Sequence, residues 1–191
     1  MYQLKENALV AVVDMIEGFI NFGALASPDI QAIVSPMAKF LEEVEARTVF
    51  LVDSHDPDST EFQDFPPHCI TGSGEDQVIA ELQPFAQRQF RKNSVNAFQA
   101  EGFRRYLEEE VPEVLNYYII GCCTDICVLN LALSLKTHLH ERNAKKEVYV
   151  IEDLVETFDL PGHDKNVEAQ GALRILKTNG VKVISLDSLK K

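Results

Sequence analysis

The sequence predicts an α/β fold: a three-layer, doubly wound domain whose mostly parallel, six-stranded sheet carries helices on both faces. Short apolar runs, typical of strands buried on both faces of a parallel sheet, alternate with segments whose apolar residues recur every three or four positions. The chain is 191 residues long and 46% hydrophobic, which suffices for a sizeable core. No internal repeat or Gly/Ser-rich linker divides it, so we expect one domain over residues 1–191.

In the first half of the chain, strands are expected at residues 7–16 and 48–53, because both segments are nearly continuous apolar runs. Residues 28–46, between these strands, carry apolar residues at helical spacing and are predicted to form one helix. Residues 56–75 are predicted to be a loop, because prolines and glycines punctuate them. Residues 75–85 are expected to form a short helix.

The second half repeats the alternation of strand and helix. Its central helix is apolar around much of its circumference, which predicts deep burial. A glycine at position 180 marks the end of the last helix. In order, we expect strand 88–92, helix 100–110, strand 114–122, helix 124–141, strand 147–151, helix 164–178 and strand 181–186.

Composition excludes several classes of function. The net charge of −12 argues against nucleic acid and against an anionic membrane surface as partners, and it does not favour a strongly anionic substrate. No stretch approaches the roughly 20 apolar residues that span a bilayer, and the first seven residues lack the features of a signal peptide. We therefore expect a cytoplasmic protein, and we expect it to form a homo-oligomer, as α/β enzymes of this size commonly do.

The segment 121–128, Gly-Cys-Cys-Thr-Asp-Ile-Cys-Val, joins an apolar strand to the long apolar helix. If Thr124 caps this helix, Cys127 lies in its first turn, where the partial positive charge of the helix lowers a thiol pKa. The N–H groups from Cys123 to Cys127 can then stabilise an oxyanion. The alternative is that Cys127 is a small core residue, which is the usual role of a lone cysteine.

Other chemically capable residues lie at the predicted carboxyl ends of strands, where ligands bind in parallel sheets. Asp14 ends the first strand, Asp53 and His55 follow the second, and Lys92 ends the third. Asp14 can instead cap a turn, and Lys92 can be a solvated charge. No histidine is placed to act as a general base for Cys127, so a Cys–His pair is not expected.

Asp53 and His55 are two positions apart, and an extended backbone places such side chains on one face. Glu61 and His68 follow in a loop that two prolines stiffen. Two imidazoles and two carboxylates suit Zn²⁺, Mn²⁺ or Fe²⁺, with positions left for water or substrate. The spacing leaves other carboxylates as competing ligands. These are Asp56, Asp58 and Asp64.

Taken together, the motifs resemble those of the isochorismatase-like cysteine hydrolases and, within them, the nicotinamidases. The resemblance covers nearly the whole chain in order. The Asp-x-His followed by Pro-Pro-His points to nicotinamidases, because isochorismatases lack that metal site. The motifs are Val12-Val13-Asp14 with Phe19, Asp53-Ser54-His55, Phe65-Pro66-Pro67-His68, Lys92 with Ala97-Phe98, and the segment 121–128.

This resemblance implies an enzyme that hydrolyses nicotinamide, a small neutral aromatic amide, to nicotinic acid and ammonia in NAD salvage. A triad of Asp14, Lys92 and Cys127 would form a thioester intermediate, and a divalent metal, zinc before manganese or iron, would orient the pyridine ring. The resemblance also implies a cis peptide bond between residues 122 and 123. The other implied site residues are the metal ligands Asp53, His55, Glu61 and His68, the ring walls Phe19 and Phe65, and the oxyanion-binding N–H groups of Cys123 and Cys127.

Two departures from the family pattern leave the substrate preference open. Ile16 and Glu17 follow Asp14 and Met15 where many relatives carry a Gln-Asn pair before an acidic residue, and Ile126 stands where some relatives carry histidine. We expect both changes to touch the pocket.

Other functions remain as alternatives. The chain can be another small-amide or carbamoyl hydrolase of the same superfamily. It can be a thiol redox module or a metal-binding module without turnover, or a metal-dependent hydrolase in which Cys127 is idle. The roles of His138, His140 and His163 are open, although His138 and His140 are expected near the negative end of a helix, where a histidine is favourable.

Overall fold

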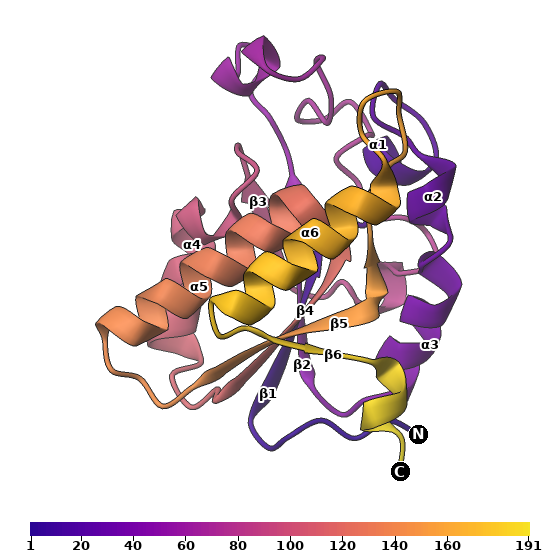
Figure 1. The fold of residues 1–191 in the computed structure, drawn as a ribbon. Helices are drawn as coiled ribbons and strands as arrows, with labels where there is room; N and C mark the ends of the chain where they lie inside the picture. Colours follow the sequence, from indigo (N-terminus) through magenta and orange to yellow (C-terminus); the bar gives the residue numbers. More distant parts are fainter.

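In the computed structural model, which describes residues 1–191, six parallel strands form one sheet (Figure 1). Their order across the sheet is β3-β2-β1-β4-β5-β6. The predicted fold class is confirmed, and the sheet is parallel throughout rather than mostly parallel. The strands are β1 (Ala8–Val13), β2 (Arg47–Asp53), β3 (Gln89–Lys92), β4 (Asn116–Cys122), β5 (Glu147–Glu156) and β6 (Lys182–Ile184).

Helices cover both faces of the sheet, because successive side chains of each strand point to opposite sides. In β1, Val10 and Val12 join one buried cluster, whereas Leu9, Ala11 and Val13 join the other. The first cluster lies under α1 (Glu17–Ile20), α2 (Pro28–Gln31) and α3 (Val34–Glu43). The second lies under α4 (Glu101–Arg105), α5 (Leu129–Glu141) and α6 (Lys165–Thr178) (Figure 1).

The single helix predicted over residues 28–46 is wrong in one respect, since the structure divides it into α2 and α3. Pro36 explains the division. A proline has no N–H group and its ring clashes with the carbonyl four residues earlier, here that of Ala32. Pro36 therefore lies in the first turn of α3, and Ala32 and Ile33 separate the two helices.

The short helix predicted over residues 75–85 is also wrong. Only one 3₁₀ turn forms there, at Gln83–Phe85. Val78 instead makes an isolated antiparallel bridge with Ile16, next to the end of β1. Asp76 is also tied elsewhere, because its carboxylate accepts hydrogen bonds from the Gly72 N–H and the Ser54 hydroxyl. These contacts with distant segments override the local preference for helix.

The strand predicted over residues 147–151 is longer in the structure, because β5 continues to Glu156. Its pairing with β4 shifts register between Ile119 and Gly121, and beyond the shift Cys122 pairs with Glu156. The exposed pair Glu152 and Asp153 interrupts the apolar run at the shift, so the continuation was not evident from the sequence. As a result, the loop after β5 begins at the edge of the sheet where the predicted site lies.

The strand order reverses between β1 and β4, and open parallel sheets bind ligands in the crevice beyond such a point. Asp14 follows β1, Asp53 ends β2, Lys92 ends β3 and Cys123 follows β4, so all four residues lie at this edge. No helix in the structure is long and apolar enough to cross a lipid bilayer.

Candidate active site

Asp14 is fully buried directly after β1 and has a left-handed backbone, with φ of 51°. Aspartate tolerates this conformation better than most residues, because its short polar side chain can bond locally. Here one carboxylate oxygen, Oδ1, accepts a hydrogen bond of 2.9 Å from the N–H of Asp53. The other oxygen, Oδ2, lies 2.9 Å from the Lys92 ammonium. The turn after β1 therefore aims the carboxylate along the ends of β2 and β3.

Lys92 connects the acidic groups with the thiol. The register of β2 and β3 places Lys92 beside Asp53, and its Nζ donates to the Asp53 carboxylate at 2.5 Å. The same Nζ lies 3.7 Å from Cys127 Sγ. Burial disfavours the charge on Lys92, but Asp14 and Asp53 outweigh it and hold the lysine pKa well above its usual value. Lys92 is therefore a buried ammonium, not a solvated charge.

Cys127 lies in the first turn of the helix that follows β4, as predicted, but Thr124 does not cap that helix. Cys123 occupies the capping position, and the hydroxyl of Thr124 is buried without a hydrogen-bond partner. Residues Thr124–Val128 form one π-helical turn that leads into α5. The turn brings the buried sulfur of Cys127 within 4.8 Å of carboxylate oxygens of Asp14 and Asp53.

The expectation of a lowered thiol pKa at Cys127 is wrong. Burial raises the pKa of Cys127 well above its usual value, and the carboxylates of Asp14 and Asp53 raise it further against the opposing charge of Lys92. The sulfur therefore carries its proton and needs a base. Burial, with Asp53 adding and Lys92 opposing, raises the pKa of Asp14 to about 7. A carboxylate that titrates near neutral pH is suited to exchange a proton with a reacting group.

The backbone between β4 and the turn Thr124–Val128 has two unusual features. Gly121 has a φ of 118°, and a Cβ there would lie 2.0 Å from the carbonyl oxygen of Val13. The peptide bond between Cys122 and Cys123 is cis, as the resemblance implied. The Cys123 N–H donates no hydrogen bond within the chain, whereas the N–H groups of Ile126 and Val128 both donate to the Cys123 carbonyl. The Cys123 N–H is thus free to bind an oxyanion.

Asp53, His55 and His68 form a buried cluster beside Asp14 and Cys127, with one ligand atom from each within 4.8 Å of the others. Both imidazoles have their Nδ1 atoms on oxygen acceptors. His55 Nδ1 lies 3.1 Å from Asn93 Oδ1, and His68 Nδ1 lies 2.8 Å from the Pro66 carbonyl. Each ring therefore uses Nδ1 for a hydrogen bond and leaves Nε2 as its ligand atom, the arrangement of histidines that bind metals through Nε2.

These residues fit a divalent metal ion. The Nε2 of His55 is buried without a hydrogen-bond partner, and such an orphaned atom is costly unless something binds it. Glu61 lies beside the cluster, with Oε1 3.7 Å from His55 Nε2 and Oε2 accepting from the Val95 N–H. The competing carboxylates do not join the cluster. These are Asp56, Asp58 and Asp64.

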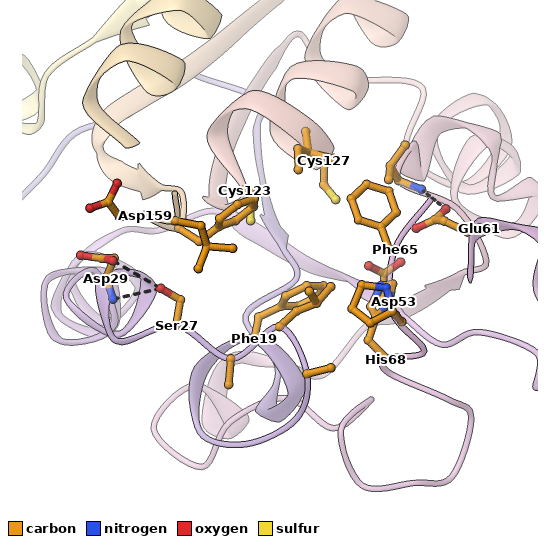
Figure 2. Close-up of a pocket in the computed structure, with 18 of the residues that line it drawn as sticks. Phe19, Ser27, Asp29, Asp53, Glu61, Phe65, His68, Cys123, Cys127 and Asp159 are labelled. Carbon is orange, nitrogen blue, oxygen red and sulfur yellow. Dashed lines mark hydrogen bonds between the residues drawn. The ribbon is translucent and has the colours of Figure 1, made fainter. Parts of the chain in front are cut away.

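One cavity of about 370 Å³ reaches both the Cys127 thiol and the candidate metal ligands Asp53 and His68 (Figure 2). The rings of Phe19 and Phe65 flank His68, with centroids 5.8 and 6.2 Å from the imidazole. Figure 2 shows Cys127 across the cavity from Phe19 and His68. The cavity is lined mainly by apolar side chains and suits a flat, uncharged ring.

The two departures from the family pattern, at Ile126 and at Ile16 with Glu17, lie differently relative to the cavity. Ile126 lines the cavity, as expected. Ile16 and Glu17 do not, so the expectation that both changes touch the pocket is wrong for this pair. Ile16 is fully buried in the core, and the carboxylate of Glu17 accepts a hydrogen bond from Asn21.

Sequence reasoning missed a contact that holds the cavity wall to the turn Thr124–Val128. His163, in the loop between β5 and α6, has its Nε2 2.8 Å from the Asp125 carboxylate and its Nδ1 3.0 Å from the Phe158 carbonyl. The Phe158 ring stacks on the imidazole at 4.0 Å and lines the cavity. Asp125 and His163 are 38 positions apart, so no sequence spacing signals this contact.

Comparisons with known proteins agree with the motifs and the geometry. Residues 7–188 match the family model for the isochorismatase domain. Nicotinamidase 1 of Arabidopsis thaliana is 29% identical over 177 residues, which cover 81% of this chain and 71% of that protein. The solved structure of nicotinamidase PncA from Bacillus subtilis has a TM-score of 0.73 at 27% identity and covers 94% of this chain and 99% of that one.

A third similar structure is that of a pyrazinamidase of Pyrococcus horikoshii in complex with zinc. It has a TM-score of 0.77 at 23% identity and covers 94% of this chain and 99% of that one. The family model spans all six strands of the sheet and all of the predicted site residues. The chain therefore belongs to the isochorismatase family of hydrolases, as its motifs implied.

Proposed function

We propose that this hydrolase is a nicotinamidase that converts nicotinamide to nicotinic acid and ammonia in NAD salvage. The observation that carries the proposal is the single cavity in which Cys127, with Asp14 and Lys92 behind it, faces the cluster of Asp53, His55 and His68. A thiol hydrolase for a simple amide needs only Cys127, Asp14 and Lys92. A metal ion held by the other three residues would bind the ring nitrogen of a heterocyclic amide. The similarity to Nicotinamidase 1 of Arabidopsis thaliana supports this assignment.

Asp53, His55 and His68 would hold the metal ion, with Glu61 as the fourth ligand. We propose zinc, because imidazole and carboxylate ligands suit it, and the zinc complex of the Pyrococcus horikoshii pyrazinamidase supports that choice. When bound, the ion supplies a Lewis acid for the pyridine nitrogen of the substrate. Phe19 and Phe65 would hold the faces of the ring, which directs the carboxamide toward Cys127.

Acylation begins with a proton transfer inside the triad. Asp14 takes the thiol proton while the sulfur of Cys127 forms a bond to the amide carbon. Lys92 remains charged and stabilises the negative charge that moves between sulfur and carboxylate. The N–H groups of Cys123 and Cys127 would bind the resulting oxyanion. Asp14 then gives its proton to the amide nitrogen, the C–N bond breaks, and ammonia leaves a thioester on Cys127.

Deacylation uses the same groups in the reverse sense. Asp14 accepts a proton from a water molecule that attacks the thioester carbonyl, and the same N–H groups bind the second oxyanion. The C–S bond breaks as Asp14 returns the proton to the sulfur. Nicotinic acid leaves, and Cys127 is again a protonated thiol beside a carboxylate. One carboxylate with a pKa near 7 thus serves as both base and acid.

A substrate panel tests the assignment. Ammonia release is measured with nicotinamide, pyrazinamide, benzamide and N-carbamoyl amino acids. We expect efficient turnover of nicotinamide and pyrazinamide, and much slower turnover of benzamide, which has the same shape but no ring nitrogen. Equal rates for benzamide and nicotinamide would contradict the role of the metal cluster. A preference for N-carbamoyl substrates would instead favour the carbamoyl hydrolase alternative.

A further inference from the structure

A second cavity, of about 330 Å³, lies at the opposite end of the sheet from the candidate active site. The strand β4 marks the separation, because Tyr117 near its start lines this cavity, whereas Cys122 at its end leads to the turn Thr124–Val128 at the candidate active site. The walls come from α4 and the turn after it, from the far half of α5, and from the loops before β4 and β5 (Figure 1). The two cavities share no lining residue.

Positive charge gathers at this cavity although the chain carries a net charge of −12. Arg104, Arg142 and Lys146 line it, and Glu108 is the one acidic residue among the lining side chains. The backbone N–H of Arg104 donates to the Ala100 carbonyl, but its guanidinium forms no ion pair or hydrogen bond within the chain, so the guanidinium donors are free. The chain has more carboxylates than basic side chains, and still Arg104 pairs with none of them. The side chains that line the cavity carry more positive than negative charge.

The contacts within the cavity show what kind of group these cations bind. Glu108 Oε1 accepts a hydrogen bond of 3.2 Å from Arg142 and lies 3.3 Å from His138 Nε2. Arg142 also lies 3.1 Å from His138 Nδ1. Lys146 Nζ donates to the Pro112 carbonyl at 2.8 Å and lies 3.4 Å from the Tyr117 hydroxyl. Of its three N–H donors, Lys146 therefore has at least one for a ligand.

The helix dipole explains part of this arrangement but not all of it. Basic residues near the end of α5, such as His138 and Arg142, stabilise its exposed carbonyl groups. Arg104 lies in the last turn of α4, but a π-helical turn at Tyr106–Glu110 follows directly, so the helical backbone does not stop beside it. Lys146 belongs to the loop before β5. The convergence of these two residues on one cavity has no such structural explanation.

The rest of the lining is apolar. The side chains are Phe98, Leu107, Leu135 and Leu139. We propose that this cavity binds a small organic anion, a phosphate or carboxylate group on an apolar body, whose charged group contacts Arg104, Arg142 and Lys146. Arginine binds both kinds of anion through two parallel N–H donors, and the apolar floor accepts the body of the ligand. The carboxylate of Glu108 already pairs with Arg142, and there it competes with the ligand.

Calorimetric titration with phenyl phosphate tests the proposal, with inorganic phosphate and phenol as the charge-only and body-only probes. We expect phenyl phosphate to bind most tightly. Arg104→Gln is expected to weaken its binding about tenfold, which is typical of one lost charge-assisted hydrogen bond. Arg105→Gln is the matched control, because Arg105 is exposed and does not line the cavity, and its affinity is expected to be unchanged.

Glu108→Gln provides a test in the opposite direction. Removing the competing carboxylate is expected to tighten phenyl phosphate binding severalfold, which a misfolded protein cannot do. The proposal is overturned if the wild-type chain does not bind phenyl phosphate. It is also overturned if Arg104→Gln binds as tightly as the wild type, or if Glu108→Gln does not bind more tightly. None of these measurements depends on turnover, so they stand apart from the proposed nicotinamidase activity.

Discussion

Lys92 is the residue on which both parts of the candidate site depend. Its ammonium contacts Asp14 and Asp53, so the same lysine contacts the proposed general base and a proposed metal ligand. Its charge also lies 3.7 Å from the Cys127 sulfur. From the sequence alone, a lysine in Arg-Lys-Asn has no sign of burial. The family resemblance singled it out, and only the register of β2 and β3 explains why it is buried.

Asn93 is the residue whose role the sequence did not suggest. Its Oδ1 accepts from His55 Nδ1 and also from the Asp56 N–H, which fixes the orientation of the amide. We predict that Asn93→Leu weakens metal binding by about 10- to 100-fold, because His55 loses the group that holds its ring and its tautomer. Competition with a chromogenic zinc chelator measures the affinity.

The control for this prediction is Asn93→Asp, which keeps an oxygen acceptor for His55 Nδ1. We expect it to retain the wild-type affinity or to exceed it. If Asn93→Leu and Asn93→Asp bound metal equally well, the hydrogen bond to His55 would have no part in metal binding.

At the scale of elements, the junction between β4 and α5 depends on a glycine. Any side chain at Gly121 would collide with the carbonyl of Val13 in β1, and its φ of 118° is unfavourable for other residues. We predict that Gly121→Ala lowers the free energy of unfolding by more than about 4 kcal/mol, which places it among the most damaging single substitutions. Urea denaturation followed by circular dichroism measures the change.

Gly171 provides the matched control. It lies inside α6, and a Cβ there would meet no atom within 4 Å. Gly171→Ala is expected to stabilise the protein by about 0.5–1 kcal/mol, because alanine has the higher helix propensity. Similar effects of the two substitutions would mean that the close approach of β1 and β4 is not what requires Gly121.

The loop between β5 and α6 is held by a histidine whose two nitrogens both face acceptors. Asp125 and the Phe158 carbonyl can each accept only, so both bonds need the doubly protonated ring. Burial opposes this charge, but Asp125 outweighs it and raises the pKa of His163 above its usual value. We predict that this contact contributes its full stabilisation free energy below pH about 6.5, the pKa of histidine in the unfolded chain. The contribution is lost as the pH rises through the higher pKa of His163 in the folded protein.

The measurement is the difference in free energy of unfolding between the wild type and His163→Gln, at pH values from 5.5 to 8.5. The difference should be largest at the acidic end and should decline toward the alkaline end. His140→Gln is the control, because His140 is exposed and its side chain has no partner. A His163→Gln difference that stays constant or grows with pH would contradict the doubly protonated state.

Most elements of the fold could be predicted from hydrophobic periodicity. Continuous apolar runs identify strands buried on both faces, and apolar residues every three or four positions identify the helices that cover them. The failures have local causes. Pro36 divides a helix whose apolar spacing is otherwise regular, and the exposed residues at the register shift hide the end of β5. The segment around Val78 follows Ile16 of a distant element instead of its own helical preference. Such tertiary contacts leave no periodic pattern in the sequence.

At the scale of the whole molecule, the candidate site joins groups from the carboxyl ends of β1, β2, β3 and β4. The sequence could place each residue at a strand end but could not show the strand order, which decides which ends are neighbours. It also could not show that burial would raise the Cys127 pKa. The contacts of Asn93 with His55 and of His163 with Asp125 each join residues 38 positions apart and were missed for that reason.

The metal is expected to contribute to global stability, because three of its proposed ligands, Asp53, His55 and His68, are buried and His55 Nε2 otherwise has no hydrogen-bond partner. A ligand at 100 times its Kd stabilises the folded state by about 2.7 kcal/mol. We predict that chelation lowers the melting temperature and that added zinc restores it. His55→Ala should melt at the same temperature with and without chelator. Persistent chelator sensitivity in that variant would place the metal elsewhere.

The central claim is that Cys127 attacks the substrate while a separate metal cluster holds it, and one experiment tests both parts. The kcat/KM for nicotinamide and the bound metal are measured on the same preparations of wild type, Cys127→Ala, Cys127→Ser and, as a buried-cysteine control, Cys69→Ala. We predict that both Cys127 variants lose at least about 10³-fold in kcat/KM with full metal content, and that Cys69→Ala stays close to wild type. Near-normal hydrolysis by either Cys127 variant would contradict the account and would favour a metal-dependent hydrolase with an idle cysteine.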